Sequence, residues 1–359
     1  MARPNQARLD LEALRHNVSV ARALAPQSKL MAVVKANAYG HGAVTIAHAL
    51  HSNVDAFAVA SIEEASALRD ADITRPILLL EGLFEASELR IAAQLDVWLS
   101  IDREQHLQWL EDSPLDKPIG CWLKVDTGMN RLGAAPAEAL QYYQRLMSTQ
   151  NAADNIVTYT HLASADDVHN QQTQRQLATF DNFAFSTARS AANSAALLAW
   201  PQTHYDWIRP GYMLYGNSPM THAHPNAQAL QPVMTLASKV IALRDVAVGE
   251  SVGYGGTWVA QRPSVIATVT IGYGDGYPRN ARNGTPVLAN GQRATLAGRV
   301  SMDMITIDVT DLENIQCGTE VILWGTDLPL GEVARWANTI GYELTTRMPQ
   351  RTPRVIVNA

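Results

Sequence analysis

The sequence predicts an α/β fold: an N-terminal TIM-type (β/α)8 barrel in residues 1–231, followed by a C-terminal, mainly antiparallel β domain in residues 232–359. Two observations predict this division. Up to about Tyr215, short continuous apolar runs alternate with helical patterns, which is typical of parallel strands covered by helices on both faces. After Pro232, apolar runs follow one another with only short turns between them, as in antiparallel hairpins.

The barrel strands are expected where apolar residues run together without interruption. In chain order these runs are Leu30–Val34, Ala56–Ala60, Ile77–Leu80, Asp96–Ser100, Ile119–Val125, Ile156–His161, Ala188–Asn193 and Tyr205–Ile208. Between the runs, apolar residues recur three and four positions apart, as in Ile62–Ala71, and this spacing indicates amphipathic helices. Eight such units across about 200 residues are sufficient for a TIM-type barrel.

The second half contains further runs that are typical of strands. They are Val233–Leu243, Val265–Gly272, Thr285–Leu288, Ala294–Gly298, Ile305–Val309 and Glu320–Leu323. Asn290 and Gly291 stand between two of them, and this residue pair favours the type I′ turn of a tight hairpin. One late helix is expected around Leu330–Thr339.

Composition excludes several classes of function. The 359 residues are 47% hydrophobic and 17% charged, with a formal net charge of −6 and no basic stripe, so no nucleic-acid partner is expected. The apolar runs fall far short of the ~18 residues that suggest a membrane span. Cys121 and Cys317 lie far apart, without a CxxC motif or a Cys/His cluster, so neither a disulfide nor a metal site is expected. Since the N-terminus lacks the apolar stretch of a signal peptide, we expect a cytoplasmic protein.

Polar residues follow the predicted barrel strands, at the end where barrel enzymes place their chemistry. Lys35 follows the first run, and partial desolvation there favours a neutral, nucleophilic amine such as a Schiff-base lysine, although a solvated surface lysine is the alternative. Lys124 ends the fifth run and His161 ends the sixth, where a structural histidine is equally compatible with the pattern. Ser194 and Gly211 follow the last two runs, where barrels often bind phosphate.

Three glycine-rich segments stand in the second half. They are GYGGTW at 253–258, GYGDGYPR at 272–279 and GRVSMDM at 298–304. Glycines beside aromatic residues permit close approach of the backbone to another group, whereas composition alone equally fits tight β turns. None is a phosphate-binding P-loop, because the Gly-Lys-Ser/Thr ending is absent.

Three more motifs stand in the barrel half: AVVKANAYGHG at 32–42, WLKVDTGMNRLG at 122–133 and RPGYMLYG at 209–216. With the glycine-rich segments they make six ordered motifs, and the chain from about Leu9 to Arg354 resembles the bacterial alanine racemases. These are fold-type III enzymes that use pyridoxal 5′-phosphate (PLP). The resemblance implies interconversion of L-alanine and D-alanine, either to supply D-alanine for peptidoglycan or to catabolise it.

The resemblance also implies a role for each matching residue. Racemisation removes the Cα proton on one face and returns a proton on the other, so two bases are needed: Lys35, which also carries PLP as a Schiff base, and Tyr254. The substrate carboxylate would be received by Arg131 and Met302. PLP would be held by Lys35, Tyr39, Asn193, Ser194, Arg209, Gly211, Tyr212 and Tyr342. The corridor through which substrate enters would be lined by Asp166, Tyr273, Arg279 and Arg299.

Supporting roles follow from the same resemblance. His161 would contact Tyr254 and ease its ionisation, and Lys124 matches a position that is carbamylated in some members, where the negative group holds Arg131. Arg209 would donate a hydrogen bond to the pyridine nitrogen of PLP. Since arginine stays protonated, it would leave that nitrogen unprotonated, and we expect this to limit transamination. One departure is Leu162, which stands after His161 where an aromatic residue is expected.

Tyr254 and Met302 would serve the site of a neighbouring subunit, so the resemblance implies a head-to-tail homodimer.

Four other functions are alternatives to racemisation of alanine. A PLP-dependent decarboxylase would need an acidic partner at the pyridine nitrogen, which Arg209 is not, and a periplasmic broad-specificity racemase would usually carry a signal peptide. A non-enzymatic PLP-binding protein would lack the β domain, and a Schiff-base aldolase would use Lys35 without PLP.

Overall fold

The computed structural model describes residues 3–183, 185 and 187–359. Its N-terminal half is a closed barrel of eight parallel strands, in which β2 pairs with both β3 and β9. The strands are β2 (Lys29–Val33), β3 (Ala56–Val59), β4 (Ile77–Leu79), β5 (Val97–Ile101), β6 (Cys121–Lys124), β7 (Val157–Tyr159), β8 (Ala188–Ser190) and β9 (Trp207–Ile208). Each falls within or overlaps one of the eight apolar runs, so the TIM-type barrel is confirmed.

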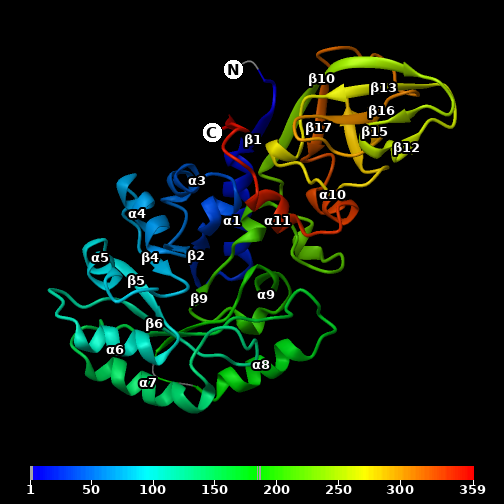
Figure 1. Cartoon of the computed structure of the whole chain (residues 1–359). Helices are drawn as coiled ribbons and strands as arrows, with labels where there is room; N and C mark the ends of the chain where they lie inside the picture. Colours follow the sequence, from blue (N-terminus) through cyan, green and yellow to red (C-terminus); the bar gives the residue numbers. More distant parts are fainter. Residues whose placement is uncertain (1–2, 184, 186) are drawn as a thin grey trace.

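Helices surround the barrel (Figure 1). They are α1 (Leu11–Leu24), α3 (Ala43–Leu50), α4 (Ile62–Asp70), α5 (Glu88–Gln94), α6 (Glu104–Asp112), α7 (Pro136–Ser148), α8 (Gln172–Asp181) and α9 (Ser194–Ala199). α1 begins where the Asp10 carboxylate accepts a 2.8 Å hydrogen bond from the Ala13 N–H, which satisfies one free donor of the first turn. Its buried face, which includes Leu14 and Val18, packs into the main apolar core.

Large aromatic side chains fill the interior of the barrel. The ring of Trp122 lies 5.5 Å from Trp207 and 5.7 Å from Tyr159, and Trp98 stacks on Trp122. Gly120 permits this packing, because a Cβ there would come within 2.3 Å of the Trp98 indole. The barrel interior is therefore a solid layer of rings below the strand ends.

The C-terminal half is an eight-stranded sheet in the order β13-β16-β15-β14-β17-β10-β1-β18, antiparallel except for the pair β1 and β18. Its strands are β10 (Met234–Val246), β13 (Ser264–Val269), β14 (Pro286–Ala289), β15 (Gln292–Leu296), β16 (Ile305–Asp308), β17 (Glu320–Trp324), β1 (Gln6–Asp10) and β18 (Arg354–Asn358). A small hairpin of β11 (Ser251–Val252) and β12 (Trp258–Val259) extends from it. The predicted β14–β15 turn is confirmed, with positive φ at Asn290 and Gly291.

The first strand of the chain differs from the prediction. β1 pairs with β10, with Gln6 opposite Ala237, and with β18, with Ala7 opposite Arg354. Residues 6–10 therefore lie in the second sheet and not in the barrel, which corrects the assignment of all of residues 1–231 to the barrel. The reason is that strand pairing is non-local and a short terminal strand gives no signal of its partner. The division near residue 231 is otherwise still a prediction.

The remaining elements, in both halves, are short helices and 3-10 turns. They are α2 (Lys35–Tyr39), α10 (Leu330–Trp336), α11 (Gly341–Thr346), η1 (Pro201–Thr203), η2 (Tyr212–Tyr215), η3 (Pro225–Ala227), η4 (Tyr254–Gly256) and η5 (Tyr273–Asp275). α11 contacts α2, and Arg354 donates hydrogen bonds of 2.8 and 3.0 Å to the Gly40 carbonyl. The late helix is confirmed as α10. Across the described residues, no helix combines the length and apolar character needed to cross a membrane.

Candidate active site

A cavity of about 370 Å³ opens at the carboxyl ends of the barrel strands. Most of the residues assigned to the barrel site lie around it: Lys35, Tyr39, His161, Asp166, Asn193, Ser194, Arg209, Gly211, Tyr212 and Tyr342. They come from separate strand ends and from α11, so only the closed barrel brings them together. Arg131 and Lys124 border the same region, since their charges act on His161.

Apart from Tyr342, the predicted residues of the β domain lie outside this cavity. Tyr254, in η4, is 69% exposed and Met302 is 54% exposed. Tyr273 and Arg279 line a separate cavity of about 410 Å³ beside α11, and Arg299 lies near Gly255. A single chain therefore does not bring the two predicted bases, Lys35 and Tyr254, to one place.

Lys35 stands at the junction of β2 and a left-handed turn. Four consecutive residues after it, Ala36 to Tyr39, have φ between 52 and 54°. Left-handed backbone costs about 1–2 kcal/mol per non-glycine residue, and hydrogen bonds offset part of this cost: the Glu64 carboxylate accepts the Ala36 N–H at 2.7 Å. The turn ends at Gly40, where a Cβ would overlap the Thr345 carbonyl oxygen at 1.8 Å.

The left-handed turn places two different groups at the cavity. Lys35 keeps an amine at the strand end, 37% exposed and 3.8 Å from a carboxylate oxygen of Glu81. Tyr39, four residues later, lies with its ring 5.0 Å from Tyr215 and 6.1 Å from Tyr342. Backbone strain of this kind persists only where the surrounding structure fixes it and is concentrated at functional sites.

Donors converge at the ends of β8 and β9. The Ser194 hydroxyl accepts hydrogen bonds from the N–H groups of Gly211 at 2.9 Å and Met213 at 3.3 Å. A Cβ on Gly211 would lie 2.5 Å from the Tyr39 hydroxyl oxygen, so backbone and phenol approach closely only with glycine there. Tyr212 stacks on Tyr342 with ring centroids 3.6 Å apart. Hydroxyls and N–H groups grouped in this way suit a phosphate.

Arg209 is fixed at the floor of the cavity. Only 4% of it is exposed, and it donates hydrogen bonds to the Thr160 carbonyl at 2.6 Å and to the Ser190 hydroxyl. Burial lowers its pKa to about 10, so the guanidinium is still charged at neutral pH. No carboxylate forms an ion pair with Arg209 in the described part of the chain.

The cavity is strongly cationic. Burial first, and then the charges of Arg131, Arg209 and Lys35, lower the pKa of Lys124 to about 8 against the opposing effect of Asp102. Burial first, and then the same cations together with Lys124, hold the pKa of His161 well below its usual value, so His161 is neutral. An excess of positive charge in a partly dry cavity favours anionic ligands such as a phosphate and a carboxylate.

Sequence reasoning missed three features of this region. Glu81 and Asp102 each follow a barrel strand, so the rule that identified Lys35 could have found them. His106, behind Asp102, gives no such signal because it lies within α6. Leu162, the departure after His161, is buried in the main core.

A larger cavity of about 490 Å³ lies at the opposite end of the barrel, around Trp98, Trp122 and Trp207. It contains none of the predicted site residues. Barrel enzymes carry their chemistry at the carboxyl ends of the strands, so the smaller cavity, with its amine, hydroxyls and guanidinium, is the candidate active site.

Comparison with known proteins identifies related chains. The family model described as alanine racemase, N-terminal domain, matches residues 9–219, and the alanine racemase C-terminal domain model matches residues 233–356. The alanine racemase of Pseudoalteromonas atlantica is 48% identical, with 100% of both chains covered. The catabolic alanine racemase of Pseudomonas putida is 48% identical, covering 98% of each. The crystal structure of the biosynthetic alanine racemase from Pseudomonas aeruginosa superposes with a TM-score of 0.96, 47% identity and 99% coverage of both chains.

Proposed function

The chain belongs to the alanine racemase family, and from this premise we propose that it works as a PLP-dependent, two-base racemase in a homodimer. It is an isomerase that interconverts L-alanine and D-alanine. The observation that carries the proposal is the convergence of the Lys35 amine, the donors at Ser194 and Gly211, and the Arg209 guanidinium on one cavity. A biosynthetic and a catabolic relative are about equally similar to this chain. Two physiological roles therefore fit it: supply of D-alanine for peptidoglycan, and breakdown of alanine.

The cavity residues fit PLP. Gly211 leaves space that a Cβ would fill against Tyr39, and the phosphate would be held there by Tyr39, Asn193, Ser194, Gly211, Tyr212 and Tyr342. Lys35 would hold the cofactor covalently, and Arg209 would donate a hydrogen bond to the pyridine nitrogen. When bound, PLP withdraws the electron pair left at the substrate Cα.

The chain supplies a base for each face of the substrate. The Lys35 amine takes or returns the Cα proton on one face, and the Tyr254 phenol of the other subunit does so on the opposite face. A phenol loses its proton in water only near pH 10, so it needs help at neutral pH. Neutral His161 has a ring nitrogen that can accept a hydrogen bond from it, and the cations around the cavity favour the phenolate.

Arginines orient the reactants without exchanging protons. Arg131, with Met302 of the other subunit, receives the substrate carboxylate, which fixes the Cα between the two bases. Arg209 can donate a hydrogen bond to the pyridine nitrogen but no proton. Addition of a proton at an atom other than Cα, which is the first step of transamination, is thereby disfavoured.

Lys124 is proposed to be carbamylated. Its pKa of about 8 leaves part of the amine neutral near pH 7, and only a neutral amine forms the N–C bond to carbon dioxide. The product is an anion among the cations of the cavity, beside Arg131. It would hold the guanidinium ready for the substrate carboxylate.

Several features of the β domain support a head-to-tail homodimer. Tyr254 and Met302 are large side chains exposed by 69% and 54%, away from the cavity of their own chain. A two-fold arrangement of barrel mouth against β domain brings each to the other subunit's cavity. Asp166, Tyr273, Arg279 and Arg299 would then line the corridor for substrate. The exposed free thiol of Cys317 supports a cytoplasmic location.

The primary experiment incubates purified protein and PLP with L-alanine, or with D-alanine, and follows both enantiomers by chiral chromatography. An approach to an equal mixture from either side is expected. The Lys35→Ala variant should bind PLP weakly and racemise neither enantiomer. A folded, PLP-loaded wild type that forms no D-alanine would contradict the proposal.

Subunit mixing tests the homodimer. Lys35→Ala and Tyr254→Phe variants are each expected to be inactive alone. When they are dissociated and reassembled together, half of the dimers are mixed, and each mixed dimer has one intact site, so about a quarter of wild-type activity should return. No recovery despite mass-spectrometric detection of mixed dimers would place Tyr254 in its own chain's site.

A further inference from the structure

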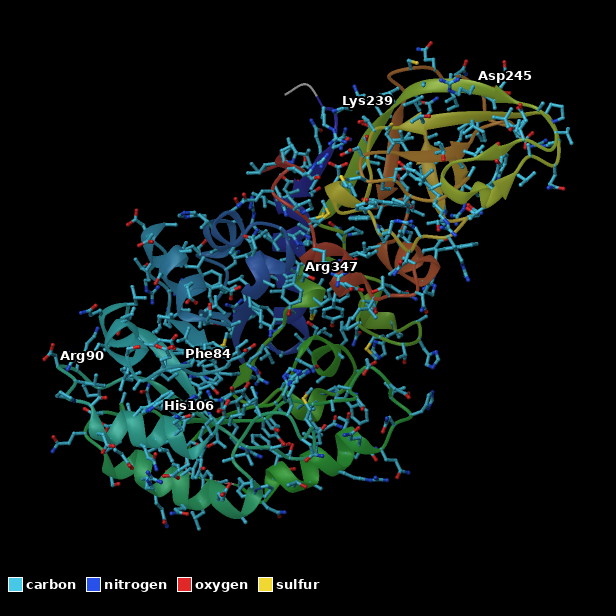
Figure 2. All side chains as sticks on the ribbon, in the orientation of Figure 1. Phe84, Arg90, His106, Lys239, Asp245 and Arg347 are labelled. Atoms are coloured by element: carbon cyan, nitrogen blue, oxygen red, sulfur yellow. The ribbon has the colours of Figure 1, made fainter. Side chains whose placement is uncertain are left out.

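A buried acid–imidazole pair lies beside the candidate active site. Asp102 follows β5, His106 lies in α6, and their side chains are 0% and 2% exposed. Asp102 Oδ1 is 3.4 Å from His106 Nδ1, and neither Asp102 Oδ2 nor His106 Nδ1 has a hydrogen-bond partner in the described structure. Figure 2 shows His106 within the barrel half, near the segment of Phe84.

The surroundings of His106 restrict its protonation. Nε2 lies 2.9 Å from the Leu83 carbonyl oxygen, so Nε2 carries a proton and donates a hydrogen bond to that oxygen. The loop approaches this closely because Gly82 has no Cβ, which would lie 2.2 Å from the imidazole. In a neutral ring of this tautomer, Nδ1 has a lone pair that faces the carboxylate of Asp102. Two acceptors that face each other repel, so one more proton belongs between them.

Lys124 is the active-site group that this proton affects. In the parallel pair of β5 and β6, Ile101 is opposite Leu123, so the next residues, Asp102 and Lys124, are neighbours. Leu123 faces the outer core, and side chains alternate along a strand, so Lys124 faces the barrel interior, while Asp102 stands just past the end of β5. The charge of Asp102 acts on Lys124. The other charged groups that act on Asp102 are Arg103, which donates a 3.1 Å hydrogen bond to Oδ1, and Glu81.

We propose that Asp102 and His106 share one proton, so that the pair presents no net charge to Lys124 and leaves its amine free to take up carbon dioxide. The inference rests on the carbamate of the proposed function. The Lys124 nitrogen bonds to the carbon of carbon dioxide and its displaced proton goes to solvent. Asp102 and His106 are thus positioning residues that act on Arg131 through Lys124.

The direction of titration agrees with this geometry. Burial raises the pKa of Asp102 and lowers the pKa of His106, so the buried pair favours a protonated carboxyl that donates to Nδ1. Loss of the shared proton would leave a carboxylate beside Lys124. That carboxylate would stabilise the ammonium form, which does not react with carbon dioxide.

Three variants separate charge from shape. His106→Gln removes the Nδ1 acceptor of the shared proton and puts an amide that can donate to the carboxylate in its place, so Asp102 is expected to ionise and the carbamate to fall about tenfold. Asp102→Asn is neutral, and its amide can donate to Nδ1, so the carbamate should persist. The double variant is neutral again and should regain it. Asp112→Asn, an exposed change in the same helix, is the matched control.

The readout is the carbamate signal of protein in 13C-bicarbonate, followed by NMR, with KM and kcat for alanine measured on the same samples. KM should rise where the carbamate is lost, and kcat should change much less. Recovery in the double variant supports the inference. A double variant as deficient as His106→Gln, an Asp102→Asn variant without carbamate, or a wild type without carbamate overturns it.

A second measurement decides the matter if His106→Gln does not fold. In wild type labelled with 15N-histidine, the Nδ1 resonance of His106 should show that this nitrogen shares a proton with a hydrogen-bond partner. A bare Nδ1 acceptor at neutral pH overturns the inference. An active wild type with equal carbamate in every variant also overturns it but leaves the proposed function intact. An inactive wild type refutes the proposed function, whereas the Nδ1 resonance still shows whether the proton is shared.

Discussion

Replacing Gly211 by alanine tests the proposed phosphate site at its tightest contact. The new Cβ would lie 2.5 Å from the hydroxyl oxygen and 3.0 Å from Cζ of Tyr39, whereas carbon contacts are favourable at about 3.5–4 Å. The Gly211 backbone cannot retreat easily, since its N–H bonds to Ser194. The phenol must therefore move by about 1 Å, or the core must absorb an overpacking cost of about 1–3 kcal/mol.

The expected result is weaker binding of PLP. If the displaced hydroxyl and the crowded N–H group lose about 1.4–2.8 kcal/mol of interaction with the phosphate, the Kd of PLP rises about 10-fold to 100-fold. Titration of the apo-enzyme, followed by cofactor absorbance, measures the Kd, and thermal unfolding without PLP measures the strain. Gly331→Ala is the matched control, because its Cβ would enter open space within α10. It should leave the Kd unchanged and raise the unfolding free energy by about 0.5–1 kcal/mol.

Two results would refute this reasoning. A Gly211→Ala variant with wild-type PLP affinity and unchanged unfolding would mean that the phosphate and Tyr39 do not meet at Gly211. Equal weakening of PLP binding in Gly331→Ala would mean that the loss does not depend on the contact. Combining Gly211→Ala with Tyr39→Phe should remove the 2.5 Å overlap and restore unfolding stability more than PLP affinity.

Other predictions concern the bases, the floor of the cavity and the response to acid. Tyr254→Phe should lower racemisation by about 10²–10⁴-fold without changing the Tm, because Tyr254 is 69% exposed; solvent deuterium should still enter one enantiomer through Lys35, and entry into both would contradict two-base chemistry. Arg209→Glu should permit transamination, seen as pyruvate, and a folded variant without pyruvate counts against the role of Arg209. His41 is fully buried, and burial lowers its pKa to about 4. As the pH falls below about 6.5, His41 is therefore protonated in the unfolded chain but stays neutral in the folded chain. The contribution of neutral His41 to the free energy of unfolding is therefore fully present above pH 6.5 and falls by about 3 kcal/mol as the pH approaches 4. Denaturant unfolding at a series of pH values should show that the free energy of unfolding falls less steeply with acid in His41→Gln than in wild type. An equal slope in the two proteins would exclude this effect.

The order of strands and helices could be predicted because it depends on local pattern. Buried parallel strands such as β3 are continuous apolar runs, and the covering helix α4 has apolar residues three and four apart. The turn at Asn290 and Gly291 could also be predicted, since few residue pairs accept positive φ at both positions. β1 could not, because five alternating residues at a chain end do not specify which distant strand they join.

The sequence also indicated Lys35 as a strand-end lysine, but it did not indicate the backbone around it. Apart from Asn37, the residues of the left-handed turn from Ala36 to Tyr39 have no intrinsic preference for positive φ, and the turn persists because Glu64 and the close packing at Gly40 hold it. Strain of this kind depends on partners far along the chain. No local pattern could have predicted it.

The sequence by itself determined the types of group available to the chemistry: an amine, a set of hydroxyls and small residues, and guanidinium groups at strand ends, in the order typical of alanine racemases. Tertiary structure alone decided their environment. Closure of the barrel brings Lys124, Arg209 and His161 together. Loss of water lowers the pKa values of all three, and the charges of neighbouring cations lower those of Lys124 and His161 further. It also leaves Tyr254 exposed on the β domain. These are properties of distance and solvent exclusion, which a chain acquires only when it folds.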